Sequence, residues 1–367
     1  MRSLYIHIPF CKKKCFYCSF VVCVHRMDAI ERYLSCLNKE SNKHEQESVQ
    51  TIYLGGGTPS SLNEEHFGIL MRMLRKKFSL VKKGEFTIEC NPEDISEERV
   101  RCYFDYGINR ISLGIQTFDD HLLRFLGRCH DSRKAYSAFE ILKRSGFKNI
   151  NVDLMYSFPQ QTKRQIQADI EKVVQLKPDH ISIYSLSIEE GSKFHVQKIK
   201  LPNERLQVQQ YMFVTELLER NGYQQYEISN FARKGKESKH NIHYWTGGNY
   251  IGLGVGAHSH HNGRRAWNVS RLSEYFKRIE RGNSPEESFE ELRPDQRLAE
   301  ALVFGLRMNR GINYKELEKR YTCRLSEEKR EQMKYFKEKR LLIEKGNIIK
   351  TTMKGRLVID EISMHLV

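Results

Sequence analysis

The first half of the sequence alternates short β-branched or aromatic runs with longer amphipathic segments, and this alternation constrains the fold more than any other feature. The short runs predict six strands, at residues 3–8, 51–55, 85–89, 110–114, 149–154 and 180–186. The amphipathic segments predict helices at residues 29–38, 64–78, 96–106, 119–126, 132–145 and 163–176. Strands separated by helices pair in parallel, so we predict an α/β fold with a parallel sheet. Periodicity leaves open whether that sheet is doubly wound or forms a barrel or part of one.

The length and the later part of the sequence indicate a second, smaller domain. At 367 residues the chain exceeds one typical domain. We expect a core at 1–265 with a helix at 201–221, a polar connecting segment at 266–292, and a small basic, helical domain at 293–367. The last of these ends in a strand, turn, strand and helix pattern that resembles a winged helix. Winged helices can bind DNA, but we interpret this unit as packing on the core or meeting a partner, and we expect no nucleic acid.

Charge, hydropathy and cysteine usage exclude several classes of protein. Lys and Arg exceed Asp and Glu by 61 to 46, a formal charge of +15, but the basic residues are scattered, which is typical of a solvated surface. No apolar run reaches the roughly 18 residues of a membrane span, and the first residues lack the pattern of a secretory signal, so we expect a cytoplasmic protein. The odd count of 9 cysteines favours reduced thiols or metal ligands over a disulfide framework.

The strongest chemical motif is a C-x3-C-x2-C run formed by Cys11, Cys15 and Cys18. Thiolates at this spacing can surround an iron–sulfur cluster or a zinc ion. Three protein ligands would leave one iron of a cluster open to a small molecule. A zinc site would need a fourth ligand, which Cys23 or His25 would supply. The remaining cysteines are expected to be small buried apolar residues.

Chemically distinctive residues follow the carboxyl ends of the predicted strands. A glycine run at 55–57 follows the second strand, and Glu89, Gln116, Arg128 and Asp153 lie at or beyond later strand ends. Because the carboxyl ends of parallel strands meet on one rim, these residues can share a site with the cysteines. Carboxylates there can accept hydrogen bonds from ribose hydroxyls or an ammonium group, and an arginine can pair with a carboxylate.

Several segments together resemble the radical S-adenosylmethionine (SAM) family, namely YIHIPFCKKKCFYCSF, LGGGTPSSL, NRISLGIQTFDDHLLRFLGRCH, NVDLMYSFP and QQYEISNFARKGKESKHNIHYW. Within that family the chain is similar to the branch that contains oxygen-independent coproporphyrinogen III oxidases and HemW-type heme chaperones. The resemblance covers about residues 1–265 and continues more weakly to the C-terminus. It implies a partial, TIM-like (β/α)6 barrel of the radical SAM type with a small helical, winged-helix-like C-terminal domain.

The resemblance also implies a [4Fe-4S] cluster and SAM as cofactors. Cys11, Cys15 and Cys18 would hold the cluster, and its open iron would take the amino and carboxylate groups of SAM. The residues implied in cofactor binding are Tyr5, Tyr17, Gly56, Gly57, Thr58, Glu89, Gln116, Arg128 and Asp153. An electron donor such as flavodoxin or ferredoxin would be needed if radical chemistry occurs.

Two departures from the oxidase pattern favour the chaperone branch. Phe20 stands where the oxidases have a further cysteine, and the chain begins almost at its first strand, where the oxidases have a longer N-terminal segment. In addition, the H-N-x-x-Y-W motif of the chaperone branch is present as His240, Asn241, Tyr244 and Trp245. Histidine is a natural axial ligand of heme iron, and the two aromatic side chains offer flat surfaces to a porphyrin.

We therefore predict a heme chaperone of the radical SAM family that binds a [4Fe-4S] cluster, SAM and heme and delivers heme to an acceptor hemoprotein, such as a respiratory one. The alternative is an oxygen-independent coproporphyrinogen III oxidase. A zinc-stapled nucleic-acid-binding protein is a more distant alternative. The sequence leaves open a homodimer and peripheral contact with a membrane.

Overall fold

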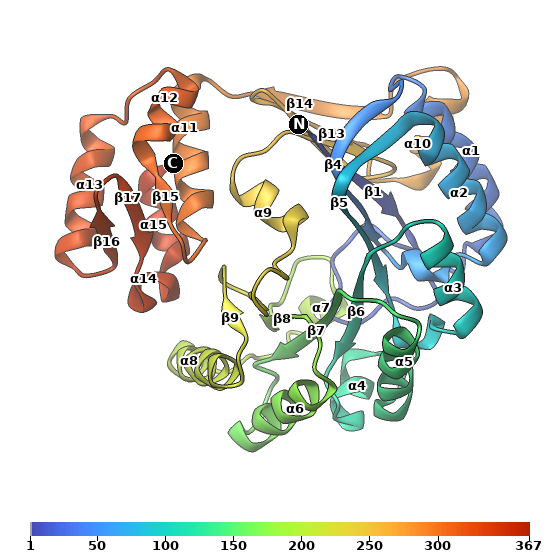
Figure 1. The fold of residues 1–367 in the computed structure, drawn as a ribbon, viewed down its shortest axis with the longest axis horizontal. Coiled ribbons are helices and arrows are strands. Elements are labelled where there is room, and N and C mark those ends of the chain that lie inside the picture. Colours follow the sequence, from blue (N-terminus) through green and yellow to red (C-terminus); the bar gives the residue numbers. More distant parts are fainter. Residues whose placement is uncertain (1) are drawn as a thin grey trace.

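The computed structural model describes residues 2–367, and its main feature is a curved, twelve-stranded sheet (Figure 1). Six neighbouring strands run in parallel and in chain order: β1 (Arg2–Ile8), β4 (Glu47–Gly56), β5 (Phe78–Cys90), β6 (Arg110–Gln116), β7 (Ile150–Tyr156) and β8 (His180–Ser185). In the described chain β1 pairs with β4 and β11 and does not pair with β8, so the parallel strands form part of a barrel. All six predicted strands are confirmed, although β5 begins earlier than expected, at Phe78.

Helices cover the outer face of this partial barrel (Figure 1). They are α1 (Ile30–Ser41), α2 (Glu64–Lys77), α3 (Glu97–Asp105), α4 (Asp120–Leu126), α5 (Ser132–Arg144) and α6 (Lys163–Leu176). Side-chain caps mark their starts: Asn63 precedes α2, Ser96 precedes α3, and Thr162 forms a capping box with Gln165 in α6. These local signals explain why the predicted helices agree with the structure to within a few residues.

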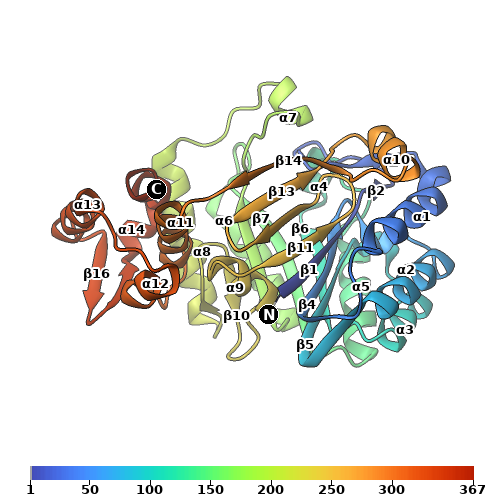
Figure 2. The ribbon, with the colours of Figure 1, turned by 90° about the horizontal axis from the view of Figure 1, so that it is seen from above.

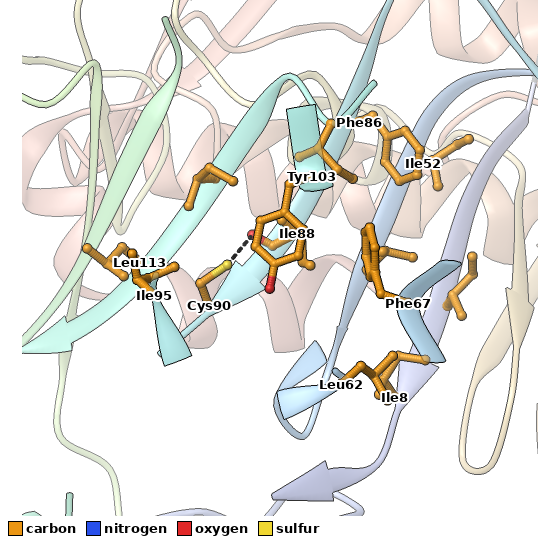
Figure 3. Packing of buried hydrophobic residues seen from close by; sticks show 14 of the residues in the cluster. Ile8, Ile52, Leu62, Phe67, Phe86, Ile88, Cys90, Ile95, Tyr103 and Leu113 are labelled. Carbon is orange, nitrogen blue, oxygen red and sulfur yellow. Dashed lines mark hydrogen bonds between the residues drawn. The ribbon is translucent and has the colours of Figure 1, made fainter. Parts of the chain in front are cut away.

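The two faces of the sheet differ in polarity. On β5, Phe86 and Ile88 point toward the helices and pack near Phe67 of α2 and Tyr103 of α3 (Figure 3). Side chains alternate along a strand, so the residues between them point to the inner face. Polar residues recur there along the six strands: Ser3, Tyr5, His7, Thr51, Tyr53, Glu85, Thr87, Glu89, Arg110, Ser112, Asn151, Asp153, His180 and Ser182. Such an inner face suits a cavity for polar ligands better than a barrel core filled by apolar side chains.

Short strands extend the sheet beyond both ends of its parallel part. On one side are β11 (Tyr250–Leu253), β12 (His258–His261), β13 (Arg264–Asn268) and β14 (Glu286–Glu291), and on the other are β10 (Asn230–Ala232) and β9 (Gln224–Gln225). Residues 266–292 are therefore not the simple connecting segment expected from their polarity. They contain the end of β13, α10 (Leu272–Glu280), which packs on α1, and β14, which pairs with β13. β14 is an edge strand with exposed charged side chains, and such a strand resembles a linker in sequence.

The C-terminal residues form a smaller domain with its own apolar core, at the left of Figure 1. Its elements are α11 (Pro294–Leu306), β15 (Ile312–Asn313), α12 (Tyr314–Tyr321), α13 (Glu327–Glu338), β16 (Leu342–Lys345), β17 (Ile348–Thr351), α14 (Met353–Leu357) and α15 (Ile359–Leu366). The three strands form an antiparallel sheet, and the β16–β17 hairpin matches the predicted strand, turn and strand.

The remaining elements connect or border the barrel. They are β2 (Phe10–Cys11), β3 (Cys23–Val24), η1 (Met27–Ala29), η2 (Pro59–Ser61), η3 (Pro92–Asp94), α7 (Lys193–Val196), α8 (Glu204–Arg220) and α9 (Lys239–Trp245). Figure 2 shows α7 on a segment that stands away from the sheet. Across residues 2–367, no helix combines the length and the apolar character needed to traverse a bilayer.

Candidate functional site

The inner face of the sheet borders a cavity of about 620 Å³, within the size range of small-molecule sites. Cys11, Cys15 and Cys18 line it, although they come from a loop outside the six strands. The expected cofactor-binding residues that line it are Tyr17, Gly56, Gly57, Thr58, Glu89, Gln116, Arg128 and Asp153. The structure thus brings the cysteine loop and the strand ends around one space.

Hydrogen bonds hold the cysteine loop at the rim. Cys11 ends β2, which pairs with β3, and its Sγ lies 3.3 Å from Oγ1 of Thr58. Nη1 of Arg128 donates to Sγ of Cys15 at 3.5 Å. Burial raises the pKa of the Cys11 thiol to about 12 and also raises the pKa of Cys18. Without a metal centre the Cys11 and Cys18 thiols stay protonated at neutral pH, whereas coordination to a metal removes the proton.

A single metal ion and an iron–sulfur cluster require different arrangements of the three cysteines. Among residues 2–367, no three His, Cys, Asp or Glu side chains converge on a position that one metal ion could occupy. A structural zinc site places four donors around one ion. A [4Fe-4S] cluster instead takes each thiolate at a different iron, so its cysteines stand further apart. Cys11, Cys15 and Cys18 line one cavity and would be the three protein ligands of a cluster with one open iron.

Glycines allow the loop after β4 to approach the cysteine segment. Gly56 has a φ of 112°, and a Cβ there would lie 2.5 Å from the His7 ring. A Cβ on Gly57 would lie 2.7 Å from the backbone of Pro9. The N–H of Gly57 donates to the carbonyl of Ile8 at 2.8 Å, so the loop is tied to the end of β1. Side chains at these positions would push the loop away from the cysteines.

Glu89 is the carboxylate at the end of β5. Its Oε1 accepts a hydrogen bond from the Tyr53 hydroxyl at 2.7 Å, and its Oε2 accepts one from the Gly56 N–H at 3.2 Å. Burial is the main cause that raises its pKa to about 7, and nearby Asp153 adds to the rise. Glu89 therefore exchanges a proton near neutral pH, and a cationic ligand in the cavity would favour its ionised form.

We expect Glu89→Gln to flatten the pH dependence of stability. The folded-state pKa of about 7 exceeds the unfolded value of 4.5. The contribution of Glu89 is therefore fully present below pH 4.5 and is lost as the pH rises through 7. The shift corresponds to at most about 3 kcal/mol. Urea unfolding midpoints at pH 5.5 and 8 measure this, and an equal fall in the variant and the wild type would contradict the assignment.

Asp153 lies on β7, which β6 separates from the strand that carries Glu89. It accepts hydrogen bonds from Nδ2 of Asn151 at 2.7 Å and from Oγ of Ser112 at 3.1 Å. Burial raises its pKa, and these hydrogen bonds oppose the rise. The network fixes the carboxylate against the cavity wall, where it can accept hydrogen bonds from a bound ligand.

Gln116 and Arg128 reach the cavity in different ways. Gln116 ends β6 with a φ of 72°, a left-handed conformation that turns the chain at the rim. Arg128 does not follow a strand end. It follows α4, which Gly127 terminates with a φ of 75°. The Arg128 side chain reaches back, and its Nη2 donates to Oδ1 of Asn91 at 2.7 Å and to the Gly114 carbonyl at 2.8 Å.

The two tyrosines expected at the cofactor differ in position. Tyr17 lies in the cysteine loop and lines the cavity. Tyr5, on β1, lies beside the cavity wall without being part of its lining. The hydroxyl of Tyr5 is 3.1 Å from Nδ1 of His7, and its ring stacks on Tyr53 with centroids 6.2 Å apart. In this arrangement Tyr5 supports the residues that line the site.

The H-N-x-x-Y-W motif forms α9, which packs against the inner face of the sheet. His240 is 2% exposed, with Nδ1 2.7 Å from Oγ1 of Thr51 and Nε2 3.0 Å from the Tyr244 hydroxyl. Burial lowers the pKa of His240 to about 3, so its imidazole is neutral at pH 7. Asn241 lines the cavity. The motif therefore places one residue at the cavity and keeps His240 just behind its wall.

Two contacts fix the ends of α9. At its start, the buried carboxylate of Glu85 accepts hydrogen bonds from the backbone N–H groups of Lys239 and His240, at 2.9 and 3.0 Å. At its end, Trp245 packs against Phe304 of α11, with ring centroids 6.1 Å apart. α9 therefore connects the inner wall of the barrel with the C-terminal domain.

One expectation for the remaining cysteines is wrong. Cys36 and Cys90 are buried as expected, and Cys23, Cys102 and Cys323 are partly buried. Cys129 is exposed, because it follows the turn that ends α4.

Comparison with known proteins places the chain in a family. Residues 5–173 match the family model of the Radical SAM superfamily. Residues 292–358 match the family model of the HemN C-terminal domain. The heme chaperone HemW of Lactococcus lactis subsp. lactis is 36% identical, over 96% of this chain and 94% of its own length. HemW of Bacillus subtilis is 35% identical, over 99% of this chain and 98% of its own length. The chain belongs to the HemW family of the radical SAM superfamily.

The HemW-family chain also resembles a solved structure. Coproporphyrinogen III oxidase (HemN) from Escherichia coli, described as a radical SAM enzyme, superposes with a TM-score of 0.88 at 25% identity. The match covers 99% of this chain and 89% of HemN. It confirms the predicted α/β fold of the radical SAM type, including the C-terminal domain.

Proposed function

We propose that this protein is a heme chaperone that binds a [4Fe-4S] cluster, SAM and heme and passes heme to an acceptor hemoprotein. The observation that carries the proposal is the similarity, at 35–36% identity over nearly the whole chain, to proteins named heme chaperone HemW. The cavity, which joins a cysteine loop to buried carboxylates, is consistent with the cofactors of the radical SAM superfamily. We further propose that the protein acts in the cytoplasm.

The cysteine loop and the strand ends would divide the cofactor binding between them. Cys11, Cys15 and Cys18 would hold the cluster, which when bound offers an open iron and an electron to the cavity. Glu89 and Asp153 face the same space and would accept hydrogen bonds from the amino group or ribose of SAM. Gly56, Gly57 and Thr58 would line the methionine end, and Tyr17, Gln116 and Arg128 complete the wall.

The residue beyond the third cysteine supports the chaperone over the oxidase. Phe20, where the oxidases resembled by the sequence have a further cysteine, is 68% exposed and lies at the cavity. A phenylalanine cannot supply a thiolate. The overall likeness to HemN favours a coproporphyrinogen oxidase as the second candidate, and the absence of this thiol weighs against it.

For heme we propose His240 as the axial ligand, with Asn241, Tyr244 and Trp245 around it. Its imidazole is neutral, and the contact of Nδ1 with Thr51 would orient the ring, as partners of metal-bound histidines commonly do. Nε2 now contacts the Tyr244 hydroxyl, so ligation requires that hydroxyl to move away. Because His240 is buried, heme uptake would also require α9 to shift from the sheet.

Hemin titration of the cluster-loaded protein tests this site. We expect saturable binding with a shifted Soret band, and at least about tenfold weaker binding in His240→Ala because an axial ligand is lost. Tyr244→Phe is the matched control: it frees Nε2 and should leave the spectrum unchanged. If the His240–Tyr244 contact had only a structural role, His240→Ala and Tyr244→Phe would change the Soret band and the hemin affinity to the same extent. Unchanged spectrum and affinity in His240→Ala would remove His240 as the ligand.

A further inference from the structure

Arg110 is a buried cation at the cavity to which the proposed cofactor site gives no role. It begins β6, is 2% exposed and lines the cavity. Its Nε is enclosed without a hydrogen-bond partner in the described chain. Placing a charge in a protein interior without a partner is strongly unfavourable. An anionic group that enters the cavity would relieve that penalty, so the environment of Arg110 points to a ligand.

The acidic residues near Arg110 do not act as its hydrogen-bond partners. Glu89 and Asp153 feel the charge of Arg110, but each already accepts two hydrogen bonds from other groups, and neither bonds to Arg110. Thr87, opposite Arg110 in the register of β5 and β6, also has a buried hydroxyl without a partner. Two adjacent positions of the inner wall thus carry polar groups whose hydrogen-bonding capacity is unfilled.

The position of Arg110 separates it from the cysteine rim. Gln116 ends β6 at the rim, and Arg110 is the first of the 7 residues of that strand. At about 3.3 Å per residue, the strand spans about 20 Å between these ends. A carboxylate bound near the cysteines therefore does not contact Arg110 at the same time. Arg110 suits a second anionic group, on a ligand that reaches deep into the barrel.

We propose that Arg110 recognises a carboxylate of a ligand bound in the cavity. A guanidinium binds a carboxylate through two parallel N–H donors, which gives both affinity and orientation. One source of this group is a heme propionate, in which case the inference rests on the proposed function. The other source is the methionyl carboxylate of a SAM molecule that binds deep in the barrel, away from the open iron of the cluster.

A coupling experiment separates these sources. Wild type and Arg110→Gln, both cluster-loaded, are titrated with hemin and with hemin dimethyl ester, and in parallel with SAM and with decarboxylated SAM. The analogues lack the free carboxylates. The loss of affinity that Arg110→Gln causes for each ligand, divided by the loss for its analogue, therefore isolates the contact of the carboxylate with Arg110. Arg124→Gln, which removes an exposed charge on α4, is the matched control. Iron content and the thermal midpoint report whether the variant folds.

We expect Arg110→Gln to weaken one carboxylate-bearing ligand at least about tenfold while changing its analogue less than about twofold. A selective loss for hemin assigns a propionate, and a selective loss for SAM assigns its carboxylate. Equal effects on each acid and its analogue overturn the proposal. If hemin fails to bind the wild type, the heme function fails, while the SAM pair still tests Arg110. If Arg110→Gln does not fold, Arg110→Lys keeps the charge without the paired donors and should show the same selectivity.

Discussion

Replacing any one of Cys11, Cys15 and Cys18 by alanine is expected to remove more than about 90% of the iron and sulfide from the anaerobically reconstituted protein. Burial raises the pKa of the Cys11 thiol to about 12, so at neutral pH this sulfur becomes a thiolate only when a metal centre binds it. With two thiolates left, the cluster has too few protein ligands to remain bound. Iron and sulfide analysis, with the absorbance of the cluster, gives the readout.

Two other cysteines provide matched controls. Cys129→Ala removes an exposed thiol next to Arg128, and Cys23→Ala removes the fourth ligand that a zinc site would need. Both variants should keep the cluster at wild-type content. Zinc in place of iron, lost in Cys23→Ala, would contradict the iron–sulfur assignment.

The second large effect concerns the reaction that this chain is expected not to perform. Reduced, cluster-loaded protein incubated with SAM and coproporphyrinogen III should yield vinyl products at less than about 1% of the rate of the E. coli oxidase HemN. Phe20 is exposed at the cavity, and its side chain lacks the thiol of the additional cysteine that the oxidases carry. Product analysis by chromatography measures the outcome.

HemN assayed in the same mixture shows that reductant and substrate are competent. A wild-type chain that converts both propionates with multiple turnovers would make the oxidase the better description. Hemin binding would then reflect the affinity of the substrate site for a related tetrapyrrole.

The parallel half of the fold follows from local sequence signals. Its strands are apolar on the outer face, its helices carry caps such as Asn63 and Ser96, and both patterns are visible without tertiary information. The strands β9 to β14 cannot be predicted from local patterns in this way, because most have only two to five residues. The longest, β14, is polar because it lies at the sheet edge. Their pairing depends on neighbours far away in the sequence.

Some residues of the candidate site can be predicted from the sequence, and others cannot. Residues at strand ends can be anticipated, because parallel strands present their carboxyl ends on one rim. Glu85 and Arg110 lie before the carboxyl ends of their strands, and the rule makes no prediction for such positions. The available signal is alternation: Arg110, Ser112 and Gly114 occupy every second position of β6, between apolar residues. A charge in such a series indicates an inner face that lines a cavity. The pairing of Glu85 with α9 depends on a contact across more than 150 residues, which no local pattern shows.

Transfer of heme to an acceptor tests the central claim most directly. Cluster-loaded protein carrying one equivalent of hemin is mixed with increasing amounts of an apo b-type cytochrome, and the Soret band of the acceptor is followed. Direct handover predicts a transfer rate that rises with acceptor concentration and exceeds the rate of heme loss to apomyoglobin. A rate that is independent of the acceptor and equal to simple dissociation would contradict a chaperone function.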